Sequence, residues 1–283
     1  MNRIVFLGSG GGRHMVATQV RRTGGLFVEF GSGEDAFAFC IDPGPGALVH
    51  SIALGLKPEK WKGIVVSHNH IDHVNDANAI IDTITTHSSD DKKDKNYPFF
   101  VGEEHCFSVA KGKDEPYPCI TKYHQSLIKK LFAMNAGDSA KIGNLEILAT
   151  KALHYTHNLG YVVKYGTLKI GYPADGSYYA GQEKHFGGCD VLILNVPWPK
   201  GYDAPKNIHM TLDDAISLVK AIQKKPKLVV ISHIAPAMLR ANLFKQEKIL
   251  ADATKCKVIS ANDFMELDLD TLQTKVLKPV ARI

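Results

Sequence analysis

The chain has 283 residues, 45% of them hydrophobic, and its 34 lysines and arginines exceed its 29 aspartates and glutamates to give a formal net charge of +5. A chain of this size can bury a substantial core, and no break in composition separates two halves, so we expect one α/β domain over residues 1–283. The small positive excess fits a small anionic substrate without requiring a nucleic acid. The sequence leaves the oligomeric state open, a homo-oligomer included.

The cysteines and the lengths of the apolar runs predict the compartment. Five cysteines are present, an odd number without a C-x-x-C pair, which is typical of reduced thiols in an intracellular protein. No apolar run approaches the roughly 20 residues of a membrane span, and the first residues lack the features of a signal peptide. We therefore expect a cytoplasmic protein with no membrane partner.

Strand-like apolar runs with glycine turns dominate the first third of the chain, at residues 4–7, 26–30 and 36–41. A turn with the sequence D-P-G-P-G, which begins at Asp42, closes the third run. A fourth run, residues 63–66, leads into a loop rich in histidine.

That loop places three imidazoles and a carboxylate within six positions, at His68, His70, Asp72 and His73. Neutral imidazole suits zinc, copper, iron and nickel, and a carboxylate supplies a hard anionic oxygen. Side chains two apart in an extended segment point to the same side, so His68 and His70 are expected to converge on one ion. Asp72 and His73 follow a bend and are candidates for a second ion.

Residues 85–134 are expected to contain an inserted loop and helix region. Within it, residues 88–96 are polar and without periodicity, which predicts a surface loop, whereas residues 97–101 resume strand character. The sequence leaves open whether this region is a lid or a partner-binding insertion.

Three later strand-like runs each end in a candidate ligand: residues 145–150 before His154, residues 168–172 before Asp175, and residues 227–232 before His233. His157 is an alternative to His154. A ligand is better fixed near the end of a strand, which favours His154 over His157.

His209 precedes a predicted helix. Thr211 is a good N-cap, Asp213 and Asp214 favour the positive helix start, and an apolar stripe continues until Pro226 stops the helix. His209 therefore lies just outside a helix start, before the run that delivers His233.

These motifs resemble those of a known family. His68-x-His70-x-Asp72-His73 resembles the signature of the metallo-β-lactamase superfamily of binuclear metal hydrolases. The spacing of His154 to Gly160-Tyr161, the H-M-T segment that begins at His209, and the opening L-G-S-G-G-G are similar to the ribonuclease Z and phosphodiesterase branch. One departure is that Gly176 and Ser177 follow Asp175 where the family has a threonine.

The resemblance implies a four-layer αββα sandwich of two mixed sheets flanked by helices. It also implies two divalent metal ions, zinc first, with manganese or iron(II) as alternatives. The first ion would be held by His68, His70 and His154, and the second by Asp72, His73 and His233, with Asp175 bridging. Asp42 would be a supporting residue.

The activity implied is metal-dependent hydrolysis, most simply of a phosphodiester by a metal-bridging hydroxide. Asp72 would orient the hydroxide and His209 would act as general acid. Three alternatives remain: a transfer-RNA 3′-processing endonuclease, a lactone or thioester hydrolase, and a non-catalytic metal-binding homologue. A small anionic substrate is favoured over a nucleic acid as the partner.

Overall fold

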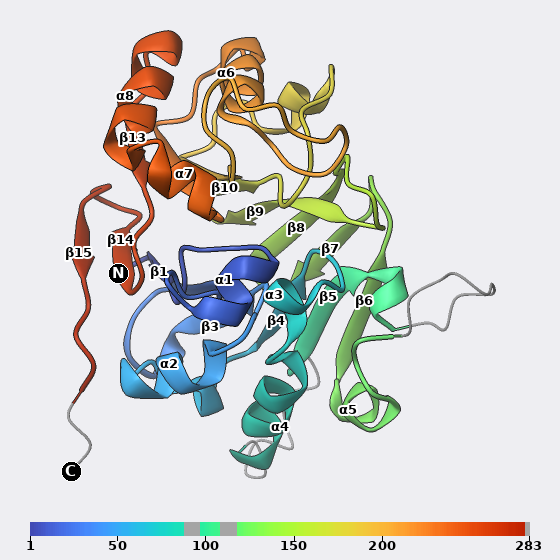
Figure 1. Cartoon of the computed structure of the whole chain (residues 1–283). Coiled ribbons are helices and arrows are strands. Elements are labelled where there is room, and N and C mark those ends of the chain that lie inside the picture. The colour runs from blue at the N-terminus through green and yellow to red at the C-terminus, as the bar shows by residue number, and fades with distance from the viewer. Residues whose placement is uncertain (88–96, 108–117, 281–283) are drawn as a thin grey trace. The chain divides into compact units, whose positions relative to one another are not determined.

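The chain folds into two compact units that are interleaved along the sequence. In the computed structural model, which describes residues 1–87, 97–107 and 118–280, the first unit comprises Met1–Gly8, Arg22–Met134 and Asn262–Ile283. The second unit comprises Ser9–Arg21 and Asn135–Ala261. Each unit is therefore assembled from segments that are far apart in the sequence, as the colours of Figure 1 show.

An eight-stranded mixed sheet forms the framework of the first unit, in the order β15-β14-β1-β2-β3-β4-β5-β6. Strands β3 to β6 are parallel, so their carboxyl ends lie at one edge. The strands are β1 (Arg3–Phe6), β2 (Leu26–Phe30), β3 (Phe37–Ile41), β4 (Gly63–Val66), β5 (Phe99–Glu103), β6 (Lys130–Met134), β14 (Met265–Asp268) and β15 (Thr274–Val276).

Helix α4 covers the apolar face of this sheet. Its residues Ala77, Ile80, Ile81 and Ile84 recur at helical spacing and are buried with β4 and β5 in one core cluster. Burying each such large apolar side chain stabilises the fold by about 1.5–3 kcal/mol. The helices of this unit are α2 (Ala47–Ala53), α3 (Ile71–Val74), α4 (Ala77–His87) and α5 (Lys122–Leu127), with short 3₁₀ turns η1 (Gly33–Asp35), η2 (Pro58–Lys60) and η4 (Glu104–Cys106).

The region expected as an insertion contributes directly to the sheet. The region contains helix α5, and residues 130–134 form β6, which pairs in parallel with β5. The sheet therefore extends further along the chain than the sequence indicated. The predicted surface loop at residues 88–96 lies outside the described residues, as do residues 108–117.

A seven-stranded mixed sheet forms the framework of the second unit, in the order β13-β12-β11-β10-β9-β8-β7. Strands β10 to β13 are parallel, and β7 to β10 are antiparallel. The strands are β7 (Ser139–Ile142), β8 (Leu145–Lys151), β9 (Leu159–Tyr165), β10 (Leu168–Tyr172), β11 (Val191–Asn195), β12 (Leu228–Ser232) and β13 (Val258–Ser260).

A capping box and a buried apolar face define helix α6. Thr211 and Asp214 form a capping box in which each side chain accepts a hydrogen bond from the other residue's backbone N–H. Leu212, Ala215 and Val219 are buried against β11 and β12. The helices of this unit are α1 (Arg13–Thr18), α6 (Leu212–Ala221), α7 (Pro236–Arg240) and α8 (Leu243–Thr254), with the 3₁₀ turn η5 (Gln182–His185).

Two mixed sheets, each covered by helices, confirm the α/β fold class expected from the sequence. Strands β2, β4 and β12 begin or end within one residue of the predicted runs. Among the described residues, no helix combines the length and the apolar character that crossing a bilayer requires.

Candidate metal centre

The first group of candidate ligands lies at the carboxyl edge of the parallel strands in the first unit. Pairing of Ile41 with Val65 places the end of β3 beside the end of β4, and the chain leaves these strands as Asp42 and as the loop 67–73. Helix α3 begins at Ile71, so the loop turns sharply there. Parallel pairing thus brings Asp42 next to the histidine-rich loop.

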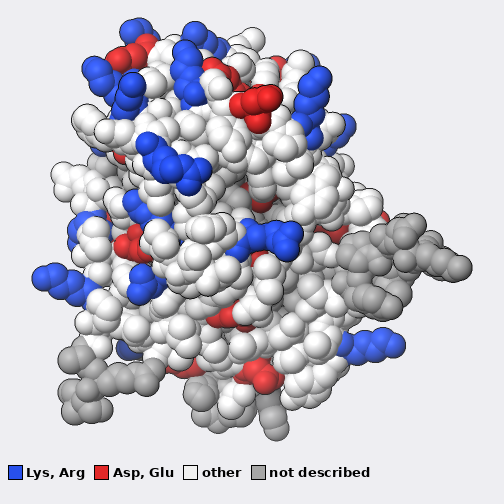
Figure 2. All heavy atoms as spheres, viewed as in Figure 1, with Lys and Arg blue, Asp and Glu red and all other residues white. Residues whose placement is uncertain are grey.

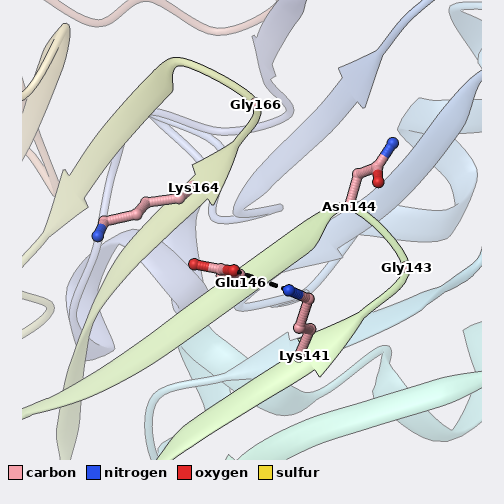
Figure 3. Close-up of a pocket in the computed structure, with 6 residues that line it drawn as sticks. All are labelled: Lys141, Gly143, Asn144, Glu146, Lys164 and Gly166. Atoms are coloured by element: carbon pink, nitrogen blue, oxygen red, sulfur yellow. Dashed lines mark ion pairs between the residues drawn. The ribbon is translucent and has the colours of Figure 1, made fainter.

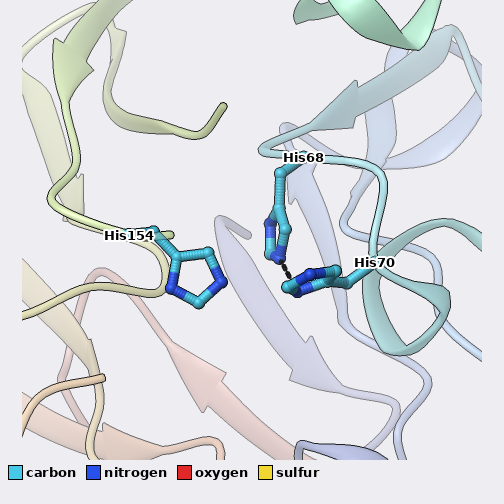
Figure 4. A group of neighbouring side chains, drawn as sticks. All are labelled: His68, His70 and His154. Atoms are coloured by element: carbon cyan, nitrogen blue, oxygen red, sulfur yellow. Dashed lines mark hydrogen bonds between the residues drawn. The ribbon is translucent and has the colours of Figure 1, made fainter. Parts of the chain in front are cut away.

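His68 and His70 point their ring nitrogens at one another. His68 Nε2 lies 2.8 Å from His70 Nδ1, the contact drawn in Figure 4. The other nitrogen of His68 is held by the Ser67 hydroxyl at 2.9 Å. In a tetrahedral zinc site, metal–nitrogen distances of 2.0–2.1 Å correspond to about 3.3 Å between donor atoms. The pair is therefore spaced much like two ligands of one ion.

His73 and Asp72 form a second pair of donors in the same loop. His73 Nε2 lies 3.5 Å from Asp72 Oδ2, close to the separation expected around one ion. His73 Nδ1 is bonded to Asp42 Oδ2 at 2.9 Å. A carboxylate that holds the outer nitrogen of a histidine fixes the ring and directs the inner nitrogen at a metal.

Asp42 therefore supports the loop, as expected. It is 2% exposed, and its two oxygens also accept hydrogen bonds from the backbone N–H of Ser67 at 2.6 Å and from its hydroxyl at 2.7 Å. Its φ of 51° is in the left-handed region, a conformation that surrounding contacts must hold. Ser67, which the sequence reasoning did not single out, connects Asp42 to His68.

Asp175 is the centre of the second group, which lies in the second unit. It is 1% exposed, and its Oδ1 accepts a hydrogen bond from Asn195 at 2.8 Å. Its Oδ2 lies 3.2 Å from His233 Nε2 and 3.3 Å from His209 Nδ1. Because β10, β11 and β12 are parallel, the residues that follow them or end them meet at one edge. Asn195 was missed from the sequence, although it is the one amide that ends the apolar run of β11.

His154 belongs to the same unit and is drawn in Figure 4. Its Nδ1 is bonded to the carbonyl oxygen of Ile208, which leaves Nε2 as the donor for a metal. Its ring centre lies 5.1 Å from that of His209. His157 is exposed, whereas His154 is half-buried. This geometry favours His154, and the choice between the two stays a prediction.

Ser177 and Gly176 occupy the place where the family pattern has a threonine. Its hydroxyl donates to the carbonyl oxygen of His209 at 3.1 Å, and its backbone forms an antiparallel bridge with Leu153. Gly176 has a φ of 146°, and a Cβ there would lie 2.8 Å from the Leu153 carbonyl oxygen. The glycine thus permits the bridge, and Ser177 links the segments that carry His154, Asp175 and His209.

The glycine-rich opening contacts His233. Gly11 belongs to the second unit, and a Cβ added to it would lie 2.0 Å from His233 Cδ2. The backbone N–H of Ile234 donates to the carbonyl oxygen of Ser9 at 2.9 Å, which holds the two segments together. His233 itself has a φ of 56°. Gly11 is therefore required by close packing against a candidate ligand, which the sequence alone did not show.

The donor atoms fit a divalent metal ion. All are imidazole nitrogens or carboxylate oxygens, a set that suits zinc, manganese or iron(II), and such residues occur in both units. For His68, His73 and His154 one ring nitrogen is held by an oxygen of a neighbouring residue, which orients the other.

A separate surface pocket lies at the opposite end of β8 from His154. Lys141, Glu146 and Lys164 line it together with Gly143, Asn144 and Gly166, as Figure 3 shows. The Lys141–Glu146 ion pair at 3.2 Å is exposed, and such pairs contribute at most about 1 kcal/mol. This pocket contains none of the candidate ligands.

Comparison with known proteins identifies the family. The family described as "Beta-lactamase superfamily domain" matches residues 38–234, which include all seven predicted ligands. The uncharacterized protein MJ1374 of Methanocaldococcus jannaschii is 30% identical over 267 residues, 94% of each chain.

Solved structures share the fold, and two of them serve as examples. The metallo-beta-lactamase fold protein YhfI from Bacillus subtilis has a TM-score of 0.72 at 18% identity, over 94% of this chain and 98% of that one. The short form of human tRNase Z has a TM-score of 0.62 at 16% identity, over 94% of this chain and 99% of that one. With the family match covering most of its length, this chain belongs to the metallo-β-lactamase superfamily.

Proposed function

We propose that this protein is a binuclear metal-dependent hydrolase that cleaves a phosphodiester. As the family resemblance implies, His68, His70 and His154 would hold one ion, Asp72, His73 and His233 would hold the other, and Asp175 would be a ligand of both. The proposal is supported by the donor pairs within each unit and by the family match that spans all seven residues. Zinc is the metal that we expect first, because imidazole predominates in the set.

The ions would supply a water of lowered pKa and positive charge for the phosphoryl oxygens. The chain's own residues then have two tasks. Asp72 and Asp175 orient the attacking group by accepting hydrogen bonds from it. His209 donates a proton to the leaving oxygen.

The position of His209 is the observation that carries the proposal. Its Nδ1 lies 3.3 Å from Asp175 Oδ2, its side chain is 17% exposed, and its backbone is held by Ser177. An alkoxide is a poor leaving group and needs a proton, whereas a thiolate leaves without one. A positioned imidazole beside the bridging carboxylate therefore favours an oxygen ester over a thioester. The net charge of +5 fits an anionic diester.

A transfer-RNA 3′-processing endonuclease is the second candidate, because the fold is similar to that of human tRNase Z. On the face drawn in Figure 2, lysine and arginine side chains are interspersed with acidic and uncharged ones. We therefore rank a small diester ahead of a folded RNA. Binding of transfer RNA that persists at high salt would reverse this order.

The decisive experiment is a substrate panel. Protein loaded with zinc or manganese is assayed on a bis-aryl phosphodiester, an aryl phosphomonoester, a lactone, a thioester and a β-lactam. We expect turnover of the diester alone, a fall of about 10²- to 10⁴-fold in kcat for His209→Ala, and unchanged metal content in that variant. Diester turnover that is low and unaffected by His209→Ala would refute the proposal.

Two further outcomes separate the remaining alternatives. Turnover of the lactone or thioester alone would assign the chain to that class of hydrolase. Fewer than about one ion per chain after gentle purification would indicate a non-catalytic homologue.

A further inference from the structure

Three aromatic rings form a row in the second unit that begins at the proposed proton donor. The ring centre of Trp198 lies 5.4 Å from that of His209 in an edge-on contact. Tyr202 stacks on Trp198 at 5.6 Å with an interplanar angle of 12°. Tyr202 is 43% exposed, so the row leads from the carboxylate of Asp175 through His209 to solvent.

Hydrogen bonds to the start of helix α6 hold the backbone segment that carries Trp198 and Tyr202. Trp198 pairs with Thr211 in a parallel bridge, and its carbonyl oxygen accepts from Leu212 at 3.0 Å. The next turn is held where the Gly201 N–H donates to Asp213 at 2.7 Å. The cap of α6 thus anchors the loop, and rings on a fixed backbone lose little freedom when a ligand binds.

Core packing does not explain this row of rings, because Tyr202 at its outer end is exposed to solvent. Aromatic rings next to basic residues bind the nucleotides of single-stranded nucleic acids in many proteins, since a base stacks on the ring and a lysine attracts phosphate. Lys200 and Lys206 lie on the same loop, and both are exposed. A lactone or a simple alkyl ester offers nothing for such a row to stack against.

We propose that Trp198 and Tyr202 bind a planar heteroaromatic ring on the leaving-group side of the substrate, so that the diester cleaved is one in which a nucleoside departs. The proposal rests on the function proposed above for the same site. It deepens that function by assigning a substrate class, and its binding step can be tested without turnover.

Intrinsic fluorescence gives a direct readout, since the chain has two tryptophans. Trp61 is 2% exposed in the core of the first unit and donates to the Leu56 carbonyl oxygen at 3.0 Å. Trp198 is half-buried, so a ligand that stacks on the row changes its emission selectively. The titrant is adenosine 5′-monophosphate, and ribose 5-phosphate is the matched ligand without a base.

We expect saturable quenching by adenosine 5′-monophosphate and little by ribose 5-phosphate. Tyr202→Leu should raise the dissociation constant of the nucleotide about tenfold or more, whereas Tyr202→Phe should retain wild-type binding because it keeps the ring. Phe244→Leu removes an aromatic side chain of the same unit that is 74% exposed, and it should change nothing. Trp198→Phe, titrated by calorimetry, should bind nearly as well as the wild type.

The outcomes separate the two proposals. If Tyr202→Leu weakens nucleotide and ribose 5-phosphate equally, or neither, the aromatic site is refuted even if diesters are hydrolysed. If the nucleotide binds in a Tyr202-dependent manner but no diester is cleaved, the binding site stands and the proposed hydrolysis fails. An unchanged melting temperature for Tyr202→Leu confirms that the variant is folded.

Discussion

The two groups of candidate ligands are built in different ways. In the first unit, His68, His70, Asp72 and His73 come from one continuous loop, and a single buried carboxylate, Asp42, holds both the loop's start and one of its rings. In the second unit, the ligands come from separate segments, and their positions depend on contacts between those segments. A group of ligands on one loop can be recognised from the spacing of its residues in the sequence, and its geometry depends on one supporting side chain. The geometry of a dispersed group depends on many contacts between segments.

Removal of the proposed bridging ligand should have the largest effect. Asp175→Ala deletes the carboxylate that we propose as a ligand of both ions, so we expect less than one ion per chain and a loss of turnover beyond the roughly 10²- to 10⁴-fold expected for a proton donor. Asp72→Ala deletes a ligand of one ion only and should retain about one ion per chain. Mass spectrometry of the metal content measures both, and equal losses would contradict the bridging role.

Asp42→Asn tests the single support of the contiguous group. The asparagine side chain has one acceptor oxygen where the aspartate has two. Either the ring of His73 or the backbone N–H of Ser67 therefore loses its partner. Loss of a residue that hydrogen-bonds a metal ligand lowers metal affinity by about 10- to 100-fold. Competition with a chelator measures the affinity. Asn195→Asp removes the corresponding hydrogen bond to Asp175. A smaller loss of metal affinity for Asp42→Asn than for Asn195→Asp would contradict the view that the contiguous loop depends on one support.

Gly11→Ala tests the packing that places His233. The new methyl group would overlap the His233 ring, and such overpacking destabilises by about 1–3 kcal/mol. We expect a lower melting temperature and weaker binding of one ion. Gly187→Ala is the matched control, because a Cβ there meets no atom within 4 Å. Equal melting temperatures for the two variants would show that the ring moves aside freely.

The smallest expected effect is a difference in the alkylation rates of cysteine thiols, and these rates report how readily each unit opens. Burial raises the pKa of Cys189 to about 11 and raises the pKa of Cys40 well above its usual value. Both thiols are therefore protonated at pH 8, and alkylation of either one requires its unit to open. The half-buried Cys119 should react first. Mass spectrometry of timed iodoacetamide reactions gives the order, and rapid labelling of Cys40 would indicate a loose first unit.

Most of the strands and the histidine loop could be predicted because their signals are local. Apolar runs such as residues 63–66 and 228–232 are buried along their whole length, as expected of parallel strands that are covered on both faces. Strand β6 was missed because it is an edge strand whose residues alternate between half-buried and exposed and whose partner lies across a long connection.

The supporting contacts could not be predicted because they join distant segments. Gly11 packs on a ring 222 positions later, and Ser177 bonds the backbone of a residue 32 positions away. No local pattern marks such a pair. The departure at Gly176 and Ser177 was visible in the sequence, but its reason is the bridge to Leu153, which only the fold supplies.

The interleaving of the two units has a consequence for synthesis on the ribosome. Strand β1 is made long before β14, which is one of its two neighbours in the sheet. The segment Ser9–Arg21 likewise waits for Ile234 and Ala261 before its contacts can form. Neither unit can finish folding until its last segment has been made, so fragments cut between residues 134 and 135 would each lack strands or contacts that the other fragment carries.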